Sequence, residues 1–422
     1  MPIAEEEGRS GVRLDGKDAM TMAKKTTGTK ASSGGRGEAL PDGRGSSGGR
    51  TPAGKRRSTR GGDGTLEKIG ALARSVAQAA HAGEAPTIEV PTRAKSNTTW
   101  DRENGILRMG DATQTRELFN LNQAKVFMQV VLQAAGIKGL LEEGKTASLR
   151  AMFYRGLHTI PGTKEKTFAD QSESDAALED LEVTLGSLRE ELHVFADVRG
   201  SLVGNITFVD TGDEIDGRRM GSGGYSIPSI VEPDVIQFKR CDAKFVLHVE
   251  KATVWRRFNE DRFWETHNCI LTHGAGQPPR GVRRLLRRFH EELNLPVYCL
   301  LDCDPWGHYI YSVIKQGSIS LAFESERLAI PQAKFLGLRA IDYQRCGLSD
   351  DVQIALNEKD VARAKQIAAY PWFKDKPAWR REIDQLLRNG FKMEVESLIT
   401  KDISYVTETY VPERLKAKDW LD

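Results

Sequence analysis

The feature that most constrains the fold is a regular alternation of apolar runs and helical segments in the second half of the chain. Three apolar runs alternate with helical patterns at 281–293 and 307–317; the runs are KFVLHVE (244–250), CILTHGAGQ (269–277) and PVYCLLDCD (296–304). Near-continuous apolar strands between helices predict a parallel sheet with helices on both faces. Binding sites in such sheets lie at the carboxyl ends of the strands. The expected fold class is therefore α/β, with a site at that edge.

Three acidic residues fall at the predicted carboxyl ends: Glu250, Asp302 and Asp304. Clustered carboxylates repel one another and raise one another's pKa unless a cation neutralises them. Mg²⁺ takes oxygen ligands, and it is commonly shared between one or two carboxylates and substrate phosphates. A turn before Pro305 explains the Asp-x-Asp pair equally simply. The residues alone leave both interpretations open.

A second pattern precedes the sheet. Two helices are predicted, at 146–157 and 172–192, followed by a glycine-punctuated strand pair at 199–210. Helix, helix and β-hairpin is the order of a winged-helix domain, a variant of the helix-turn-helix that commonly docks on DNA. Many such units bind only protein, so the pattern by itself does not decide the ligand.

The N-terminal segment differs in composition from the rest. Residues 1–64 hold 15 of the 40 glycines and a net charge of +5, against −3 for the remainder. Such a segment buries too little apolar surface to fold, and we expect disorder. An amphipathic helix at 66–80 and a second helix at 121–141 follow. The sequence does not decide whether Met1 or Met22 is the initiator methionine.

Targeting signals are missing from the sequence. No apolar run nears the ~20 residues that span a bilayer, and the first residues lack an apolar signal region. The five cysteines form no CxxC pair, which indicates free thiols in a reducing compartment. We therefore expect no membrane partner and a cytoplasmic, nucleoid-associated location.

The segment from VEKATVWRRF through CLLDCDPWGHYI to VIKQGS resembles the Toprim domain of the A subunit of type IIB DNA topoisomerases, topoisomerase VI. SLRAMFYRGL and RGSLVGNITFVDTGDEIDGRRMGSGGYSIP are similar to the winged-helix domain of that family and to its junction with Toprim. The resemblance covers roughly residues 65–422. It implies four regions: a disordered tail (1–64), a segment contacting the B subunit (65–99), a CAP-like winged-helix domain (100–209) and a Toprim domain with C-terminal elaborations (210–422).

The resemblance also implies site residues. The catalytic tyrosine of the family matches Tyr154, and its motif arginine matches Arg150. The Toprim metal ligands match Glu250, Asp302 and Asp304. The glycine turn and the arginine after it match Gly274, Gly276 and Arg283, which are expected to contact DNA. On the 281–293 helix, half of the basic stripe is expected to be an ordinary solvated face, with i,i+4 pairs Arg287–Glu291 and Arg288–Glu292.

The implied activity is Mg²⁺-assisted, transient cleavage of double-stranded DNA through 5′-phosphotyrosyl links, for ATP-dependent strand passage. The family tyrosine meets the metal site of a second protomer, which requires a homodimer. The sequence has no GxxxxGK[ST] phosphate loop. ATP-coupled strand passage then needs another chain, and the resemblance implies a B subunit with a GHKL-type ATPase in an A2B2 heterotetramer, which we expect to dock around 66–140. Two alternatives stay open: a meiotic-type break former without strand passage, and a non-catalytic DNA-binding module.

Overall fold

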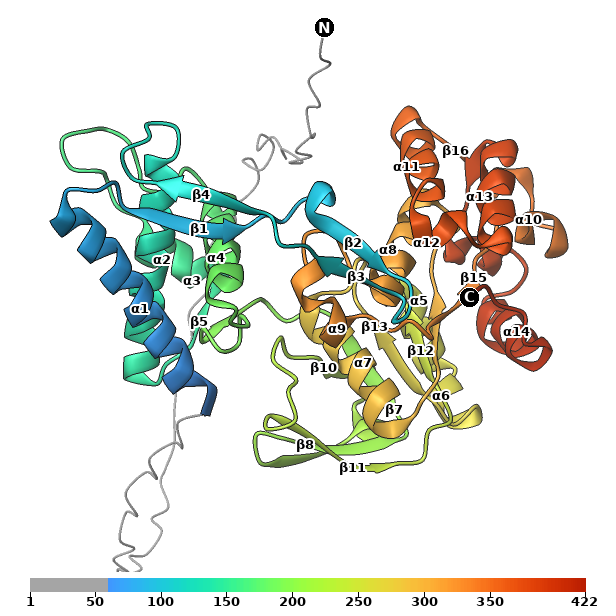
Figure 1. The fold of residues 1–422 in the computed structure, drawn as a ribbon. Coiled ribbons are helices and arrows are strands. Elements are labelled where there is room, and N and C mark those ends of the chain that lie inside the picture. The colour runs from blue at the N-terminus through green and yellow to red at the C-terminus, as the bar shows by residue number, and fades with distance from the viewer. Residues whose placement is uncertain (1–59) are drawn as a thin grey trace, which may run out of the picture. The chain divides into compact units, whose positions relative to one another are not determined.

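The computed structural model describes residues 60–422, so the predicted disordered tail lies almost entirely outside the described residues. The first part of the described chain holds four helices and six short strands (Figure 1). They are α1 (Arg60–Ala82), β1 (Thr87–Pro91), β2 (Thr98–Asp101), β3 (Ile106–Met109), β4 (Thr113–Glu117), α2 (Ala124–Glu143), β5 (Ala147–Ser148), α3 (Leu149–Gly156), α4 (Gln171–Leu185) and β6 (Val194–Phe195).

Helices α1 to α4 share one apolar core. The apolar stripe of α1 contributes Ile69, with Leu72 and Val76 packed against it, and α2 contributes Phe127 and Ile137. The amphipathic face predicted at 66–80 is therefore covered within this chain. Helix α2 is long and apolar enough to cross a membrane by length and composition, contrary to our expectation from the sequence. Because its apolar side chains pack into this core, the same pattern is that of a core helix.

Helix α4 is shorter than predicted. It begins at Gln171, where the Asp170 carboxylate caps the N–H groups of Ser172 and Glu173, and it ends at Leu185. Gly186 follows with φ 52°, a left-handed conformation that glycine adopts without steric cost and that ends helices. The leucine periodicity that predicted a helix to residue 192 continues past this glycine, but the helix does not.

The remaining elements form the sheet domain and its covering helices. They are β7 (Ser201–Gly204), β8 (Ile206–Asp210), β9 (Asp213–Asp216), β10 (Tyr225–Ser226), β11 (Ile236–Cys241), β12 (Val246–Val249), α5 (Ala252–Glu260), α6 (Phe263–Thr266), β13 (Ile270–His273), α7 (Arg280–Leu293), β14 (Val297–Leu300), α8 (Pro305–Gln316), α9 (Ser325–Leu328), β15 (Lys334–Gly337), α10 (Asp342–Arg345), β16 (Ile354–Ala355), α11 (Glu358–Ala368), α12 (Pro371–Lys374), α13 (Pro377–Asn389), β17 (Phe391–Lys392) and α14 (Val411–Ala417).

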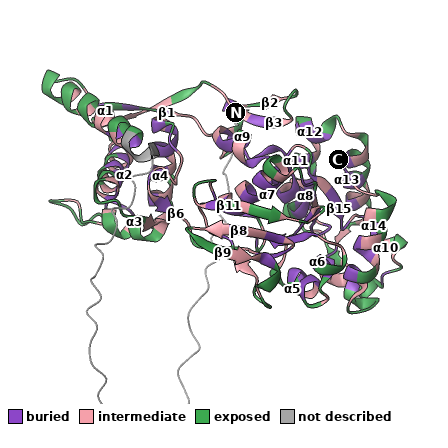
Figure 2. Ribbon diagram, turned by 90° about the horizontal axis from the view of Figure 1, so that it is seen from below, coloured by how far each residue is buried: buried purple, intermediate pink, exposed green. Residues whose placement is uncertain are grey.

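The main sheet confirms the predicted parallel arrangement. Its strand order is β10-β7-β13-β12-β14-β15, and β13, β12, β14 and β15 run parallel. Successive side chains of a strand point to opposite faces. On β12, Val246 packs with α7 and α8, and Leu247 packs with α5 and α6. Figure 2 shows buried residues, in purple, around α7, α8 and β15 of this part of the chain.

The prediction that residues 199–210 form a β-hairpin is wrong. Both strands exist, but β7 pairs with β13 of the main sheet, and β8 pairs with β9 and β11 in a separate three-stranded sheet. Gly204, at φ 140°, lies between them, where a Cβ would meet the Cys269 carbonyl at 2.3 Å. The chain therefore crosses from one sheet to another at this glycine and does not form a hairpin.

One edge strand of the main sheet is very short, and the other edge strand is bonded to a segment near the C-terminal end of the chain. The β10 edge has two residues, Tyr225 and Ser226. At the other edge, Phe335 of β15 exchanges two backbone hydrogen bonds of 2.9 Å with Leu421.

Candidate active site

Helix α3 presents Tyr154 to solvent. The helix begins with Ser148, whose Oγ accepts a hydrogen bond from the Ala151 N–H at 3.1 Å. Met152 is buried, and the Phe153 ring packs against Phe168. Tyr154 is 57 % exposed. The hydroxyl is therefore not enclosed in the core. A tyrosine with a purely structural role usually has its ring buried and its hydroxyl bonded inside the protein.

Arg150 lies one helical turn before Tyr154. Its Nη2 donates to the Tyr154 hydroxyl at 3.3 Å, and its Nη1 donates to Gln171 Oε1 at 3.4 Å. The described residues provide no carboxylate partner for this guanidinium. Arg150 therefore keeps donors available for an anion that approaches the tyrosine hydroxyl.

The three predicted acids follow two adjacent parallel strands. Glu250 comes directly after β12, and Asp302 comes two residues after β14; the register pairs Val249 with Leu300. Asp304 is the N-cap of α8, where its Oδ1 accepts from the Gly307 N–H at 2.5 Å. The Glu250 carboxylate accepts the Asp302 N–H at 3.0 Å. The fold thus brings the three residues to one edge of the sheet.

Burial and mutual repulsion oppose ionisation of these carboxyls. Desolvation, followed by the nearby Asp302 charge, raises the pKa of Glu250 to about 7. Desolvation raises the pKa of Asp302 to about 6, although Lys251 opposes the shift. Burial also raises the pKa of Asp304. A positive charge placed among these oxygens would remove much of this cost.

The structure does not point all three carboxylates at one centre. Asp302 Oδ2 pairs with Lys251 Nζ at 2.9 Å, and Asp302 Oδ1 accepts the Val395 N–H at 2.8 Å. Asp304 is engaged in capping α8. Across residues 60–422, no group of three or more His, Cys, Asp or Glu side chains is arranged to hold a metal ion. The three metal ligands therefore stay a prediction.

The donor chemistry nevertheless fits Mg²⁺. The acids supply largely buried carboxylate oxygens, all three with pKa values raised by burial, and Mg²⁺ needs only one or two carboxylates when substrate phosphates complete its shell. Sequence reasoning missed Lys251, whose ammonium pairs with Asp302, Glu394 and Glu396. Its position directly after Glu250 was the available signal. The two glutamates lie too far along the chain to be linked to it by sequence pattern.

The predicted glycine turn lies against this edge of the sheet. The Gly276 N–H donates to the Glu250 carbonyl at 2.9 Å, and its φ of 95° favours glycine. A Cβ on Gly274 would meet Pro278 at 2.7 Å. Both glycines thus have a structural reason to be there, and their DNA contact stays a prediction.

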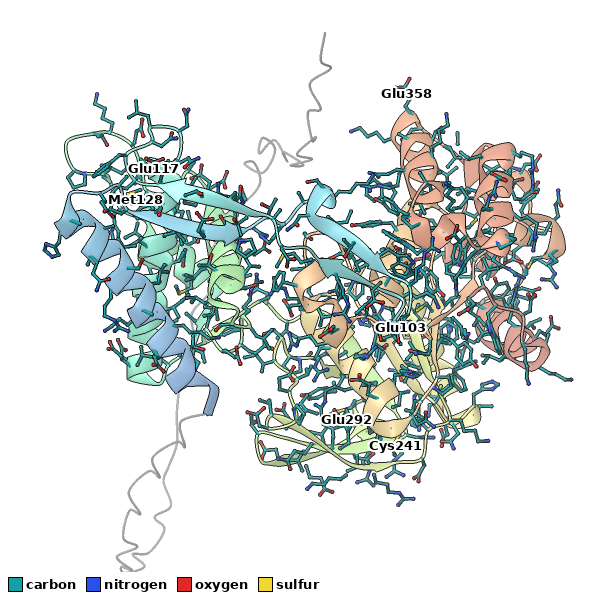
Figure 3. The ribbon with its side chains drawn as sticks, viewed as in Figure 1. Glu103, Glu117, Met128, Cys241, Glu292 and Glu358 are labelled. Atoms are coloured by element: carbon teal, nitrogen blue, oxygen red, sulfur yellow. The ribbon has the colours of Figure 1, made fainter. Side chains whose placement is uncertain are left out.

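Arg283 is buried and does not lie on the surface of α7, and its contact with DNA stays a prediction. Its side chain is 2 % exposed, and desolvation lowers its pKa to about 10. The solvated face predicted for Arg287 and Arg288 is wrong, because residues 231–236 and the segment after α9 cover these two side chains. Arg288 is 1 % exposed and donates to the Val231 and Ile236 carbonyls. The i,i+4 pairs Arg287–Glu291 and Arg288–Glu292 are confirmed; Figure 3 labels Glu292 in the last turn of α7.

Tyr154 and the acids are separate within one chain. Helix α3 packs against α2, α4, β5 and β6, whereas the acids lie on the sheet formed by β12 and β14. No hydrogen bond in the described residues joins Tyr154 to any of the three acids.

Comparison with known proteins decides the family. Three protein-family models match: type IIB DNA topoisomerase over residues 125–194, the all-beta domain of the DNA topoisomerase VI alpha subunit over 199–242, and the Toprim domain of the topoisomerase 6 A subunit/Spo11 over 245–415. A protein of Pyrococcus horikoshii, named as the A subunit of type 2 DNA topoisomerase 6, is 41 % identical over 360 residues, 83 % of this chain and 94 % of that protein. The chain belongs to the A-subunit family of type IIB DNA topoisomerase 6.

Other members of this topoisomerase 6 family agree. The protein of the same name from Aeropyrum pernix is 40 % identical over 81 % of this chain and 91 % of its own length. The one from Natronomonas pharaonis is 35 % identical over 79 % of this chain and 90 % of its own. The resemblance read from the sequence is thereby confirmed, and the chain is the DNA-cleaving A subunit of a topoisomerase. The all-beta domain match, residues 199–242, includes the strands at 199–210 that we had predicted to form the hairpin of a winged-helix domain.

Proposed function

We propose that Tyr154 is the nucleophile with which this protein cuts duplex DNA. The observation that carries the proposal is the exposed Tyr154, whose hydroxyl accepts a hydrogen bond from the Arg150 guanidinium, a group without a carboxylate partner in the described residues. A phenol is a weak nucleophile at neutral pH and needs activation together with charge stabilisation on the phosphate. Arg150 is placed to supply both, by orienting the hydroxyl oxygen and by binding a phosphate oxygen in a planar, bidentate manner.

The proposed step exchanges one phosphate ester for another. The Tyr154 hydroxyl gives up its proton as its oxygen attacks the phosphorus and forms a tyrosyl O–P bond. The bond from phosphorus to the 3′-oxygen breaks, and that oxygen leaves with its electron pair and takes up a proton. The phosphate stays linked to the 5′ end. Because the ester bond is conserved, attack by the 3′-hydroxyl reverses the step without ATP.

The acidic edge of the sheet is the proposed site for Mg²⁺, with Glu250, Asp302 and Asp304 as ligands. A bound Mg²⁺ would supply positive charge beside the phosphate and the departing oxygen. Lys251 would hold the Asp302 carboxylate in place through their 2.9 Å ion pair.

We further propose that two copies act together. Cutting both strands needs two nucleophiles, and the described contacts of one chain do not join Tyr154 to the acids. A homodimer in which Tyr154 of one protomer meets the acids of its partner satisfies both requirements. ATP would be bound by the separate B subunit in an A2B2 assembly, since the sequence carries no GxxxxGK[ST] phosphate loop.

Within residues 66–140, the region proposed to contact the B subunit, the exposed apolar side chains are not those of the amphipathic helix expected from the sequence. The apolar face of α1 packs into its own core, whereas Phe119 and Leu121 are 67 % and 96 % exposed. Exposed apolar side chains of this size suit a protein contact. Deleting residues 1–140 would remove most of core helix α2, so point variants are the better test.

We expect the double variant Phe119→Ser, Leu121→Ser to lower the yield of the B subunit that co-purifies with this chain, with no loss of the homodimer. The matched control is Ile399→Ser with Ile403→Ser, two exposed apolar residues elsewhere on the chain. Full recovery of the B subunit with the first variant would exclude this contact.

The test of the nucleophile is Tyr154→Phe in the A2B2 complex. Incubation with supercoiled plasmid, Mg²⁺ and ATP, followed by denaturant, traps covalent protein–DNA adducts. We expect adducts from the wild-type chain and none from Tyr154→Phe, with duplex binding retained. The control is Tyr343→Phe, which removes a hydroxyl that bonds to Asp350 and lies outside α3.

Adducts in the Tyr154→Phe variant would refute the assignment. The same reactions, run without denaturant, report plasmid relaxation. Relaxation that requires the B subunit together with ATP supports strand passage, whereas cleavage without relaxation would favour the break-forming alternative.

A further inference from the structure

A cavity of about 410 Å³ lies beside the first turn of α7. Its lining comes from three stretches of chain: residues 189–199, Ser229 with Ile230, and the segment from Gln277 to Arg283 that leads into the helix. The volume falls within the range of small-molecule sites. None of the residues proposed for DNA cleavage lines it.

Four arginines line the cavity, and two of them are already neutralised. Arg189 Nε pairs with Glu182 at 2.5 Å, and Arg280 pairs with Glu182 at 2.7 Å and Glu324 at 2.8 Å. The one acidic residue in the lining, Glu190, pairs with Arg327. These pairs hold the wall of the cavity together and leave its other two cations without an ion pair.

The two unpaired cations are Arg283 and Arg199. Arg283 is 2 % exposed, and its Nε and Nη2 have no hydrogen-bond partner. Burial of a guanidinium without partners is costly, which is why its pKa falls to about 10. The group remains charged at neutral pH. Arg199 is exposed at the cavity and forms no ion pair within the described residues.

The start of α7 adds further donors. The first intrahelical hydrogen bond runs from the Arg283 N–H to the Pro279 carbonyl, so the N–H groups of residues 280–282 precede it. Pro279 has no side chain that could cap them. A Cβ on Gly281 would meet the Pro228 carbonyl at 2.4 Å, so only glycine allows this turn to pack so closely beside Ser229. The positive end of a 14-residue helix therefore faces the same lining as the two arginines.

We propose that this cavity binds an oxyanion of the phosphate class, held by Arg283, Arg199 and the backbone N–H groups at the start of α7. The ligand is a phosphate group, either from a free phosphate compound or from the DNA backbone. Such a ligand satisfies the donors that the fold leaves unpaired at Arg283 and neutralises the two cations. The site is separate from the proposed cleavage residues, so it does not depend on the assignment of Tyr154.

The test is equilibrium dialysis of the full chain against radiolabelled inorganic phosphate at constant ionic strength, without Mg²⁺ or ATP. We expect one phosphate per wild-type chain, at least a tenfold weaker dissociation constant for Arg283→Met, and a several-fold weaker one for Arg199→Gln. The matched control is Arg381→Gln, an exposed arginine of α13 without an ion pair in the described structure, and it should bind as the wild type does. Tyr154→Phe should also bind normally, which separates this site from the cleavage assignment.

Two outcomes overturn the proposal: no stoichiometric binding to the wild type, or unchanged binding to both arginine variants. Arg283→Met should melt no lower than the wild type without phosphate, because it removes a buried unpaired charge. If it fails to fold, the exposed Arg199→Gln decides alone, and unchanged binding refutes the site. A short duplex added to the dialysis identifies the source: displacement of phosphate assigns the site to the DNA backbone, and retention assigns it to a free phosphate compound.

Discussion

Glu250 and Asp302 are placed where neither gains stability from its charge. Both follow buried strands, and burial raises their pKa values to about 7 and about 6; the Asp302 charge adds to the shift of Glu250, and the Asp304 charge adds to that of Asp302. For an acid, a folded-state pKa above the unfolded value near 4 means that ionisation costs folding free energy. The cost is absent below about pH 4 and grows as pH rises through 7. Such a cost at residues of a proposed site indicates that function keeps them there.

We therefore predict opposite effects of Glu250→Gln on stability and on activity. At pH 8 without Mg²⁺, the variant should melt at a higher temperature than the wild type, because a buried charge and its repulsion of Asp302 are removed. In the A2B2 complex with Mg²⁺, it should form few or no covalent DNA adducts. The control Glu103→Gln changes a solvent-exposed carboxylate (labelled in Figure 3) and should alter neither. Lower stability together with normal adduct formation would show that Glu250 is a structural acid.

At the residue scale, the sequence predicted the positions of the site but not its counter-charges. Tyr154 and Arg150 are one helical turn apart, so their proximity follows from helix geometry once the helix is assigned. Lys251 was missed as the partner of Asp302 because its other partners, Glu394 and Glu396, come from a distant segment. The burial of Arg283 was not predicted, because helical periodicity shows which side of a helix is apolar but does not show which of its other sides are covered by distant segments.

At the element scale, helix α7 shows how covering segments change the role of a basic stripe. The Arg288 guanidinium is inside the protein, between Glu292 and the backbone carbonyls of Val231 and Ile236. Those carbonyls lie at β11 and the loop that precedes it. The arginine therefore ties the three-stranded sheet to α7, where the sequence suggested only a solvated ion pair.

Arg288→Met should lower the free energy of unfolding by about 3 kcal/mol, because two buried carbonyls and one carboxylate lose their donor. Thermal and urea unfolding of the full chain measure the change. Arg381→Met, on an exposed face of α13, should stay within about 0.5 kcal/mol of the wild type. An equally small effect of Arg288→Met would mean that water replaces the guanidinium.

Helices, and parallel strands that are connected by helices, were mostly predictable from the sequence. The strands at 244–250, 269–277 and 296–304 follow from apolar runs of the right length, and the helices at 281–293 and 307–317 follow from helical patterns; α5 and α6, between the first two strands, were not predicted. The supposed hairpin was wrong because β7 finds its partner in β13, more than 60 residues along the chain, and no local pattern records that choice. The end of α4 was readable from Gly186, but the leucine spacing beyond it obscured the signal.

At the scale of the whole molecule, Asp422 joins three distant segments. Its carboxylate pairs with Lys315 at 2.9 Å, Lys334 at 3.0 Å and Lys376 at 3.3 Å. Burial opposes its charge, but the three ammonium groups more than offset this and lower its pKa. The stability that it contributes is therefore present above the unfolded pKa near 4 and is lost as pH falls below it. Burial lowers the pKa of Lys315 to about 8, so the pair also weakens above that pH.

Asp422→Asn should lower the melting temperature between about pH 5 and 8. The difference from the wild type should shrink progressively below pH 4, where the unfolded chain takes up a proton at Asp422 before the folded chain does, and again above pH 8, where Lys315 loses its proton. The control Asp375→Asn breaks a solvent-exposed pair with Arg102 and should have little effect at any pH. A difference that does not vary with pH would assign the effect to packing.

The neighbouring backbone contact, Leu421 on Phe335, has a consequence for association. An uncovered strand of a sheet is a template on which a second polypeptide can add its own strand, and long templates of this kind lead to aggregation. Here one border is occupied by the chain's own last residues, and the other is a two-residue strand. The main sheet therefore offers no long free strand to a second copy, so in the proposed homodimer we expect any contact made by this sheet to run through side chains, which can release and rejoin, and not through added strands.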